Sequence, residues 1–351
     1  MKESSKSKEN HNLNEIKVLK INPCLKYKNN FNTNNNEQRF NEIFEVFKSY
    51  KDKKECLASP NFKTNNINII SLTDNKIIKS LEGHESHITS IRYFINNKNY
   101  MEYLVSTEQT SMLIIWDISN NYNIVSKIKI DYKDNILSCL LIFNLNISNY
   151  NNLIITSCSC MGFTKIYSFD NNLFLKNIPN TENNLTNYLL LWNNSKNNNN
   201  YIIECCFKKI CIYNLLNNNE LYANLISDKT ANSEHFSGII YTKNYIDLLL
   251  VSSNNGYLEI WNLFDKNIYF YININGSKLM DVIQWNNKYI IVTDYENQYI
   301  KIVDITQMKI IGNISGEGIV SIKKIKKIND IKYGQGIISS GNDNFLKVWT
   351  L

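Results

Sequence analysis

The segments LIIWDI (residues 113–118), LEIWNL (residues 258–263) and LKVWTL (residues 346–351) share one pattern, in which alternating apolar residues lead to a Trp. Four weaker copies, NIISL, TKIYSF, CIYNLL and IKIVDI, have an aromatic or apolar residue in place of the Trp. In chain order, the residues at this position are Ile70, Trp116, Tyr167, Tyr213, Trp261, Val303 and Trp349. They are 42 to 51 residues apart, near the roughly 40–45 residues of a repeat unit with four strands. The spacing therefore predicts a sevenfold repeat.

The second unit shows the whole repeat most clearly. The apolar segment ITSIRYF (88–94) is followed by EYLVST (102–107), the polar turn EQTS (108–111) and the motif strand. Apolar side chains alternate along these segments as they do in β-strands, and no window sustains a helical period. We therefore predict an all-β fold, a seven-bladed β-propeller of four-stranded antiparallel blades. The blades are expected at residues 42–82, 88–131, 136–179, 185–228, 239–275, 279–314 and 319–351.

The seventh blade reaches the end of the sequence after only three strands, so its outer strand must come from elsewhere in the chain. The segment EIKVLKI (15–21) alternates apolar and polar residues, and we expect it to close the ring as that strand. Closure removes open sheet edges, which promote aggregation. We therefore predict one domain over residues 15–351, preceded by a polar tail at residues 1–14 that we expect to be disordered.

Two residue pairs of the second unit resemble the WD-repeat (WD40) β-propeller family. Gly83-His84 stands where that family has its Gly-His pair, and Trp116-Asp117 stands where it has its Trp-Asp pair. The resemblance covers residues 16–351, with degenerate repeats, since only the second unit has both pairs intact.

The resemblance implies a buried hydrogen-bond network within a blade, which joins the His, a Ser of the second strand, an Asp of the turn and the Trp. We therefore expect structural roles for His84, Trp116, His235, Trp261, Asp343 and Trp349. Thr110 and Asn255 occupy the Asp position in the second and fifth blades, and the seventh blade alone retains the Asp. We therefore expect the network to be incomplete in every blade.

The same resemblance implies that one face of the ring binds peptides through the residues just before and just after the first apolar residue of each inner strand. In this chain those positions include Glu42, Phe44, His87, Thr89, Leu137, Ile240, Lys278 and Met280. An exposed apolar cluster rimmed by polar groups is typical of a binding surface. A register slip of one residue would instead turn these side chains to the opposite face of the strand, and the sequence leaves both alternatives open.

No combination of residues predicts an active site or a metal centre. The His residues are His11, His84, His87 and His235, and none lies beside a plausible nucleophile. The sequence has no Gly-rich phosphate loop. Three Cys residues, at 205, 206 and 211, fall in predicted strands, where buried structural thiols fit better than a zinc site. We therefore expect no catalytic residue, no metal and no cofactor.

The charge pattern does not favour nucleic acid as a partner. The net charge of +6 arises from 38 basic and 32 acidic residues that are scattered along the chain, and only Arg39 and Arg92 supply guanidinium groups. Phosphate binding requires a concentrated basic face. The polar first 14 residues lack the apolar core of a secretory signal, and no apolar run reaches the roughly 18 residues of a membrane span. We therefore expect a cytoplasmic protein without membrane insertion, and leave a nuclear location open.

Three functions are compatible with such a fold. The first is a non-catalytic scaffold that binds a protein or peptide on the ring face, as a subunit of a larger complex. The second is the substrate receptor of a ubiquitin ligase, which usually carries Trp-Asp-x-Arg; here Trp116-Asp117 continues as Ile118-Ser119. The third is a phosphoinositide-binding propeller, which the absence of paired Arg residues disfavours. We expect the first function and do not expect an enzyme.

Overall fold

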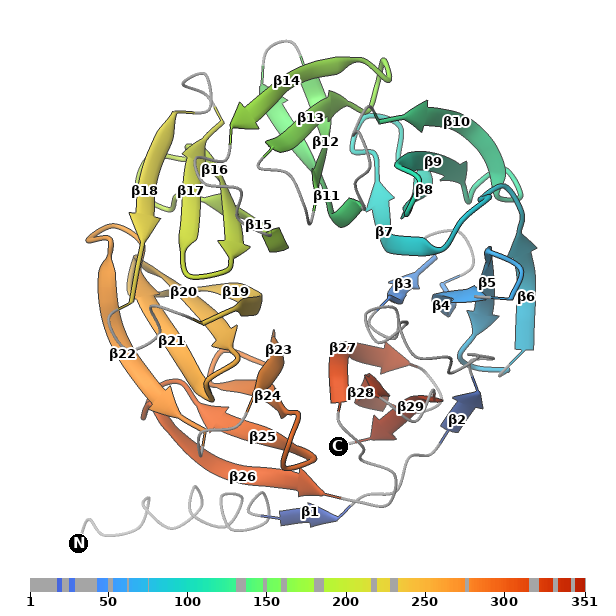
Figure 1. Ribbon diagram of the computed structural model, residues 1–351. Helices are drawn as coiled ribbons and strands as arrows, with labels where there is room; N and C mark the ends of the chain where they lie inside the picture. The colour runs from blue at the N-terminus through green and yellow to red at the C-terminus, as the bar shows by residue number, and fades with distance from the viewer. Residues whose placement is uncertain are drawn as a thin grey trace, which may run out of the picture.

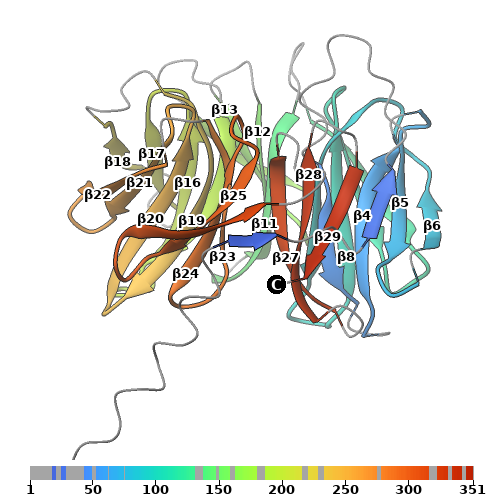
Figure 2. The same cartoon turned by 90° about the horizontal axis from the view of Figure 1, so that it is seen from below.

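The computed structural model describes residues 18–20, 25–28, 43–49, 53–61, 63–74, 76–130, 137–147, 150–158, 163–179, 186–215, 220–227, 233–274, 278–315, 322–330, 334–341 and 345–350. Within these ranges the chain is all-β, and its sheets are arranged as seven blades around a central axis (Figure 1). Seen from the side in Figure 2, the strands run across the thickness of the ring and the loops lie on its two faces. The predicted fold class is confirmed.

Each blade is an antiparallel sheet whose first strand lies nearest the axis and whose last strand lies on the rim (Figure 1). Blades one to three comprise β3 (Glu45–Lys48), β4 (Glu55–Asn61), β5 (Asn66–Ser71), β6 (Lys76–Leu81); β7 (Ile88–Ile95), β8 (Glu102–Glu108), β9 (Met112–Asp117), β10 (Asn123–Lys129); and β11 (Leu137–Ile147), β12 (Tyr150–Cys158), β13 (Phe163–Ser168), β14 (Phe174–Pro179).

The remaining blades follow the same order. Blades four and five comprise β15 (Thr186–Asn193), β16 (Asn200–Cys206), β17 (Ile210–Asn214), β18 (Leu221–Leu225) and β19 (His235–Lys243), β20 (Ile246–Ser253), β21 (Tyr257–Asn262), β22 (Asn267–Asn273). Blades six and seven comprise β23 (Leu279–Gln284), β24 (Tyr289–Asp294), β25 (Tyr299–Asp304), β26 (Lys309–Ser315) and β27 (Ile322–Asp330), β28 (Gly334–Gly341), β29 (Phe345–Thr350).

The ring is closed by an N-terminal strand, but not by the predicted one. Strand β2 (Leu25–Lys28) pairs antiparallel with β29 and is the fourth strand of blade seven. The described part of the predicted segment 15–21 is β1 (Val18–Lys20), which instead pairs parallel with the rim strand β26 of blade six. Both segments alternate apolar and polar residues, so alternation alone could not show which of them reaches blade seven. The expected tail at residues 1–14 lies outside the described residues.

The hydrophobic core is divided into clusters that each lie between two neighbouring blades. Trp116, for example, packs with Ile69 of blade one, and Trp261 packs with Ile203 of blade four. Because each sheet is covered on both faces, the second strand of a blade is buried along almost its whole length. Phe44 belongs to the cluster between blades seven and one and is only 1 % exposed. It is therefore a core residue, which corrects its expected place on the binding face.

Ring closure by β2 makes a testable prediction. Deleting residues 1–24 keeps β2, whereas deleting residues 1–29 leaves β29 as an open edge. We expect the longer deletion to lower the free energy of unfolding by at least about 2 kcal/mol, because several backbone hydrogen bonds worth about 1 kcal/mol each are lost. The shorter deletion removes only the added strand β1 and leaves every blade with four strands, so it should lower the free energy of unfolding less. Chemical unfolding of the two proteins measures the difference, and equal stability would contradict closure by β2.

Candidate functional site

A β-bulge near the start of the inner strand gives blades two to seven a common register. In blade two it lies between Ile88 and Ser90, opposite Glu108 and Thr107 of β8. The corresponding shifts are Leu137/Cys139, Thr186/Tyr188, His235/Ser237, Leu279/Val282 and Ile322/Lys324. A bulge adds one residue to one strand of a pair, so the bulges show which residues occupy equivalent positions and therefore which residues reach the ring face.

Four of the expected face residues keep their positions in this register. In blade two, the first residue of the inner strand is flanked by His87 and Thr89. In blade six, it is flanked by Lys278 and Met280. The first three side chains are partly buried, and Met280 is 8 % exposed. His87, Thr89 and Lys278 can therefore contribute polar groups to this face, while Met280 lies mostly beneath it.

Two expected face residues are displaced. Leu137 aligns with the first strand residue itself rather than with a flanking position, a difference of one residue. In blade five the first strand residue is His235, so Glu234 and Phe236 are the flanking residues and Ile240 lies further along the strand. In blade five the difference is four residues, because our alignment placed His235 at the loop position of His84, whereas His235 lies on the strand itself. Glu42 lies outside the described residues.

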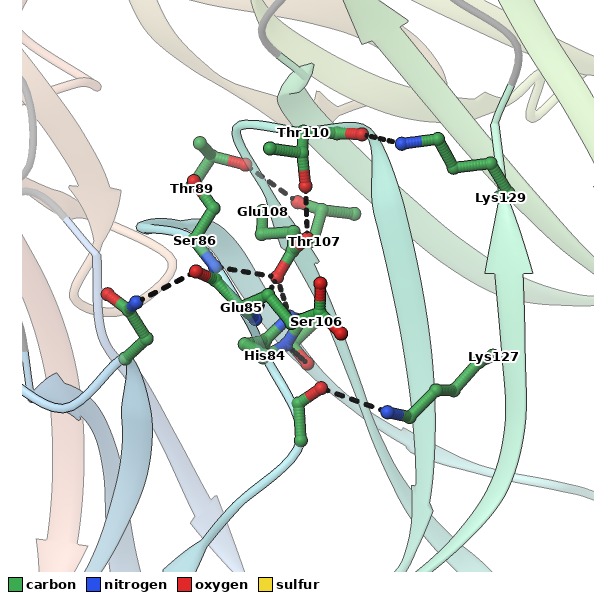
Figure 3. Close-up of polar contacts among 12 residues, drawn as sticks. His84, Glu85, Ser86, Thr89, Ser106, Thr107, Glu108, Thr110, Lys127 and Lys129 are labelled. Carbon is green, nitrogen blue, oxygen red and sulfur yellow. Dashed lines mark hydrogen bonds and ion pairs between the residues drawn. The ribbon is translucent and has the colours of Figure 1, made fainter.

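Blade two contains a complete hydrogen-bond network, which corrects our expectation that every blade lacks one. Ser106 Oγ accepts from Trp116 Nε1 at 2.8 Å and lies 2.6 Å from His84 Nε2. His84 Nδ1 donates to the Glu108 carboxylate at 2.9 Å (Figure 3). Glu108 therefore provides the carboxylate that we had sought two residues later, at Thr110. The Thr110 hydroxyl itself donates to Glu108.

Glu108 also holds the loop before β7. Its Oε2 accepts from the backbone N–H groups of Glu85 and Ser86 at 2.9 and 3.2 Å (Figure 3). Burial alone would raise the pKa of Glu108, but the hydrogen bonds from His84, Thr110 and these two N–H groups outweigh burial and lower the pKa to about 2. The carboxylate is therefore ionised at neutral pH and fixes both the network and the loop that carries His87.

We predict that Glu108→Ala lowers the free energy of unfolding at pH 7 by about 3 kcal/mol, because it leaves several buried donors without an acceptor. Glu108→Gln should lower the free energy of unfolding by a smaller amount. Since the folded pKa is about 2 and the ordinary value is 4.5, the stabilisation by the ionised carboxylate is present above pH 4.5 and disappears as the pH falls towards 2. Urea unfolding across this range should show the wild type converging on Glu108→Gln, and a constant difference would contradict the network.

In blade five, different residues form the corresponding hydrogen bonds to the buried Trp and His. Val251 replaces the Ser of the second strand, and the Glu259 carboxylate takes its place by accepting from Trp261 Nε1 at 2.9 Å. The other Glu259 oxygen lies 3.3 Å from His235 Nε2, and His235 Nδ1 donates to the Cys206 carbonyl of blade four at 2.9 Å. His235 is thus buried on β19, at the position of Ile88 rather than at the loop position of His84 that we had expected.

Blade seven retains only part of the network among the described residues. Trp349 Nε1 donates to Ser339 Oγ at 2.7 Å, and both side chains are buried. Asp343 lies outside the described residues.

One sector of the ring face carries three partly buried aromatic side chains, Phe207, Phe236 and Tyr295, which we call the aromatic sector. They come from blades four, five and six, and Phe207 forms a β-bridge with the residue two before Phe236. Lys278 Nζ lies 4.7 Å from the centroid of the Phe236 ring and 5.8 Å from that of Tyr295. Lys208 Nζ lies 5.2 Å from the Phe207 centroid. The sector therefore combines flat apolar surface with positive charge.

The inner strands near the axis are joined by a hydrogen bond and by ion pairs. Asp281 of blade six accepts from Ser237 of blade five at 2.5 Å and pairs with Lys324 of blade seven at 3.2 Å. Arg92 lies 3.9 Å from the Glu45 carboxylate, which Lys326 also contacts at 3.3 Å. Arg92 is thus engaged near the axis and does not lie on a blade rim, where phosphoinositide binding would require it.

Two of the predicted buried thiols lie near a buried carboxylate. Cys205, Cys206 and Cys211 are fully buried and form no disulfide, and Cys206 and Cys211 interact electrostatically with Glu204. Glu204 is also fully buried, and neither of its oxygens makes a well-aligned hydrogen bond with the described residues. Burial raises the pKa of Glu204 to about 7, although Thr164 and Lys209 act in the opposite direction. No three His, Cys, Asp or Glu side chains of the described ranges come together as ligands for a metal ion.

We predict that the Glu204 carboxyl makes the protein less stable as the pH rises from 4.5 to 7, because the unfolded chain loses this proton first. The cost is about 3 kcal/mol above pH 7, at roughly 1.4 kcal/mol for each pKa unit. Glu204→Gln keeps the shape but cannot ionise, so its melting temperature should exceed that of the wild type increasingly up to pH 7. A difference that does not change with pH would contradict the raised pKa.

No protein-family model matches the chain, and a search of curated proteins found no matching relative. Within the described residues there is no helix, and so none long and apolar enough to span a membrane.

Proposed function

We propose that the protein is a non-catalytic WD-repeat scaffold that binds a protein or peptide segment on the face containing the aromatic sector, as a subunit of a larger complex. The observation that carries this proposal is the cluster of three partly buried aromatic rings, each with a Lys ammonium nearby, on the ring face. The assignment to the WD-repeat family is supported by the blade period and by the His84–Ser106–Trp116 network.

The chemistry of the aromatic sector favours peptide binding. Aromatic rings provide large contact areas and lose little conformational entropy on binding, so they often dominate interface energies. Phe236 and Tyr295 are attached to the ends of strands, and the Tyr295 N–H donates to the Lys278 carbonyl at 2.9 Å. Because the backbone under the rings is held in place, a bound segment would not have to order this part of the face.

The test is to compare partner capture by the wild type and by Phe236→Ala/Tyr295→Ala. We expect the double variant to bind its partner at least about tenfold more weakly, since truncation of a central interface aromatic often costs about 2 kcal/mol of binding free energy. Its melting temperature should stay close to that of the wild type, because both rings are only partly buried. Affinity purification with quantitative mass spectrometry and thermal melting measure the two effects.

Tyr245→Ala is the matched control. Tyr245 is 83 % exposed and lies in the turn at the other end of β19, on the opposite face of the same blade. It should leave partner capture unchanged. If the double variant captures every partner that the wild type captures, the aromatic sector is not the binding site. If only the control loses the partner, the opposite face is the site.

A further inference from the structure

The innermost strands of the ring carry most of the excess positive charge of the chain. Strands β3, β7, β11, β15, β19, β23 and β27 together contain seven Lys and Arg residues but only three Asp and Glu residues. The basic residues are Lys48, Arg92, Lys243, Lys323, Lys324, Lys326 and Lys327, and the acidic residues are Glu45, Asp281 and Asp330. This excess of four charges is two thirds of the net charge of +6 of the whole chain.

Strand β27 contributes most of this excess. Its sequence is IKKIKKIND, with four Lys residues, and it is the inner strand of blade seven (Figure 1). Lys side chains are almost never buried unless they are paired, yet Lys323 is only 6 % exposed. Charges of one sign that gather between low-dielectric walls focus the electric field and attract counter-ions. The Lys residues of β27 therefore favour an anion near the axis.

Lys324 reaches across the axis of the ring. Its Nζ lies 4.9 Å from the centroid of the Tyr188 ring, although Tyr188 belongs to blade four, three blades away (Figure 1). The same Nζ lies 3.2 Å from the Asp281 carboxylate of blade six. Burial and the charge of Arg92 in blade two lower the pKa of Lys324, but the contacts with Asp281 outweigh them and raise it. The ammonium group is therefore charged at neutral pH, and side chains from four blades approach one another.

The charge of Arg92 is only partly balanced within the described residues. Its Nη1 donates to the carbonyl of the adjacent Ile91 at 2.9 Å, and its only carboxylate within 4 Å in these ranges is that of Glu45, at 3.9 Å. Lys326 Nζ lies closer to the same Glu45 oxygen, at 3.3 Å, so two cations share one carboxylate. A guanidinium has five N–H donors, and most of those of Arg92 have no acceptor in the described part of the chain.

Small ions can reach these cations. The side chains of Arg92 and Lys326 are 26 % and 28 % exposed, and that of Lys324 is 13 % exposed. Such limited exposure near the axis suits a small group rather than the surface of a folded protein. We call these three residues the axial cluster.

We propose that the axial cluster binds a phosphate group near the axis of the ring. The planar guanidinium of Arg92 matches the oxygen geometry of a phosphate, and the two ammonium groups supply further positive charge. A phosphate group with more than one negative charge also balances more of the excess on the inner strands than a single carboxylate does. The site lies at the centre of the ring and is therefore distinct from phosphoinositide binding by paired Arg residues on a blade rim.

Calorimetric titration of the purified chain with inorganic pyrophosphate, at constant ionic strength, tests this proposal. The wild type should bind one pyrophosphate per chain. Arg92→Gln should bind it at least about tenfold more weakly, because charge-assisted hydrogen bonds are lost. Lys326→Gln should also weaken binding, and it replaces Arg92→Gln if that variant unfolds. A wild type that does not bind pyrophosphate overturns the proposal, and so does a folded Arg92→Gln or Lys326→Gln variant that binds it equally well.

Lys327→Gln is the matched control. It removes the same charge from the same strand, but Lys327 Nζ donates to the Trp285 carbonyl of blade six at 2.5 Å and does not belong to the axial cluster. It should bind pyrophosphate nearly as well as the wild type. A loss as large as that of Arg92→Gln would show that only the overall charge matters, and would overturn the site.

Glu45→Gln distinguishes an anion site from a set of ion pairs that needs no ligand. The Glu45 carboxylate competes with the ligand for Arg92 and Lys326, so its neutralisation should tighten pyrophosphate binding severalfold. Unchanged or weaker binding by the folded variant overturns the proposal. Parallel titration with O-phosphoserine identifies the source of the group. Tighter binding of pyrophosphate supports a free polyphosphate as ligand, and tighter binding of O-phosphoserine supports a phosphorylated side chain.

Discussion

Burial of both faces of every blade is the constraint on which the rest of this structure depends. Each hydrophobic cluster is shared by two blades, from the cluster of blades one and two to the cluster of blades seven and one. A single blade therefore has no core of its own, and the first and last blades must meet. This is why an N-terminal strand, β2, completes the sheet of the C-terminal blade seven. It is also why the second strands are buried along nearly their whole length.

The same burial imposes a second requirement, because a polar group between two blades must find a partner. The indole N–H of Trp116 donates to Ser106, whereas that of Trp261 donates to Glu259. Trp192, which lies outside the repeated motif, donates to Asp247 of the next blade at 2.8 Å. The acceptor differs in each case. A buried donor without any acceptor would lower the free energy of unfolding more than the exchange of one acceptor for another does. Degenerate repeats can therefore retain one fold as long as each buried donor is satisfied.

This explains which features the sequence could predict. The spacing of the Trp positions depends on the length of a blade, and it predicted the number and order of the blades correctly. Local choices were harder to predict: two N-terminal segments had the alternation of a closing strand, and Glu108 lies two residues before the turn position that the family resemblance indicated. In blade five, aligning His235 with His84 placed the inner strand four residues too late, because His235 lies on the strand itself. A buried His can occupy the loop, as His84 does, or the strand, as His235 does, so its presence in the sequence could not decide the register.

The geometry of a closed ring separates its binding surfaces. The aromatic sector lies where strands begin and end, on a face of the ring, whereas the rim presents the backbone edge of one strand, as where β1 pairs with β26. A ligand on the face contacts side chains from several blades, but a strand on the rim contacts the backbone of one blade. Because the core between blades is close-packed, neither contact needs to move the other surface.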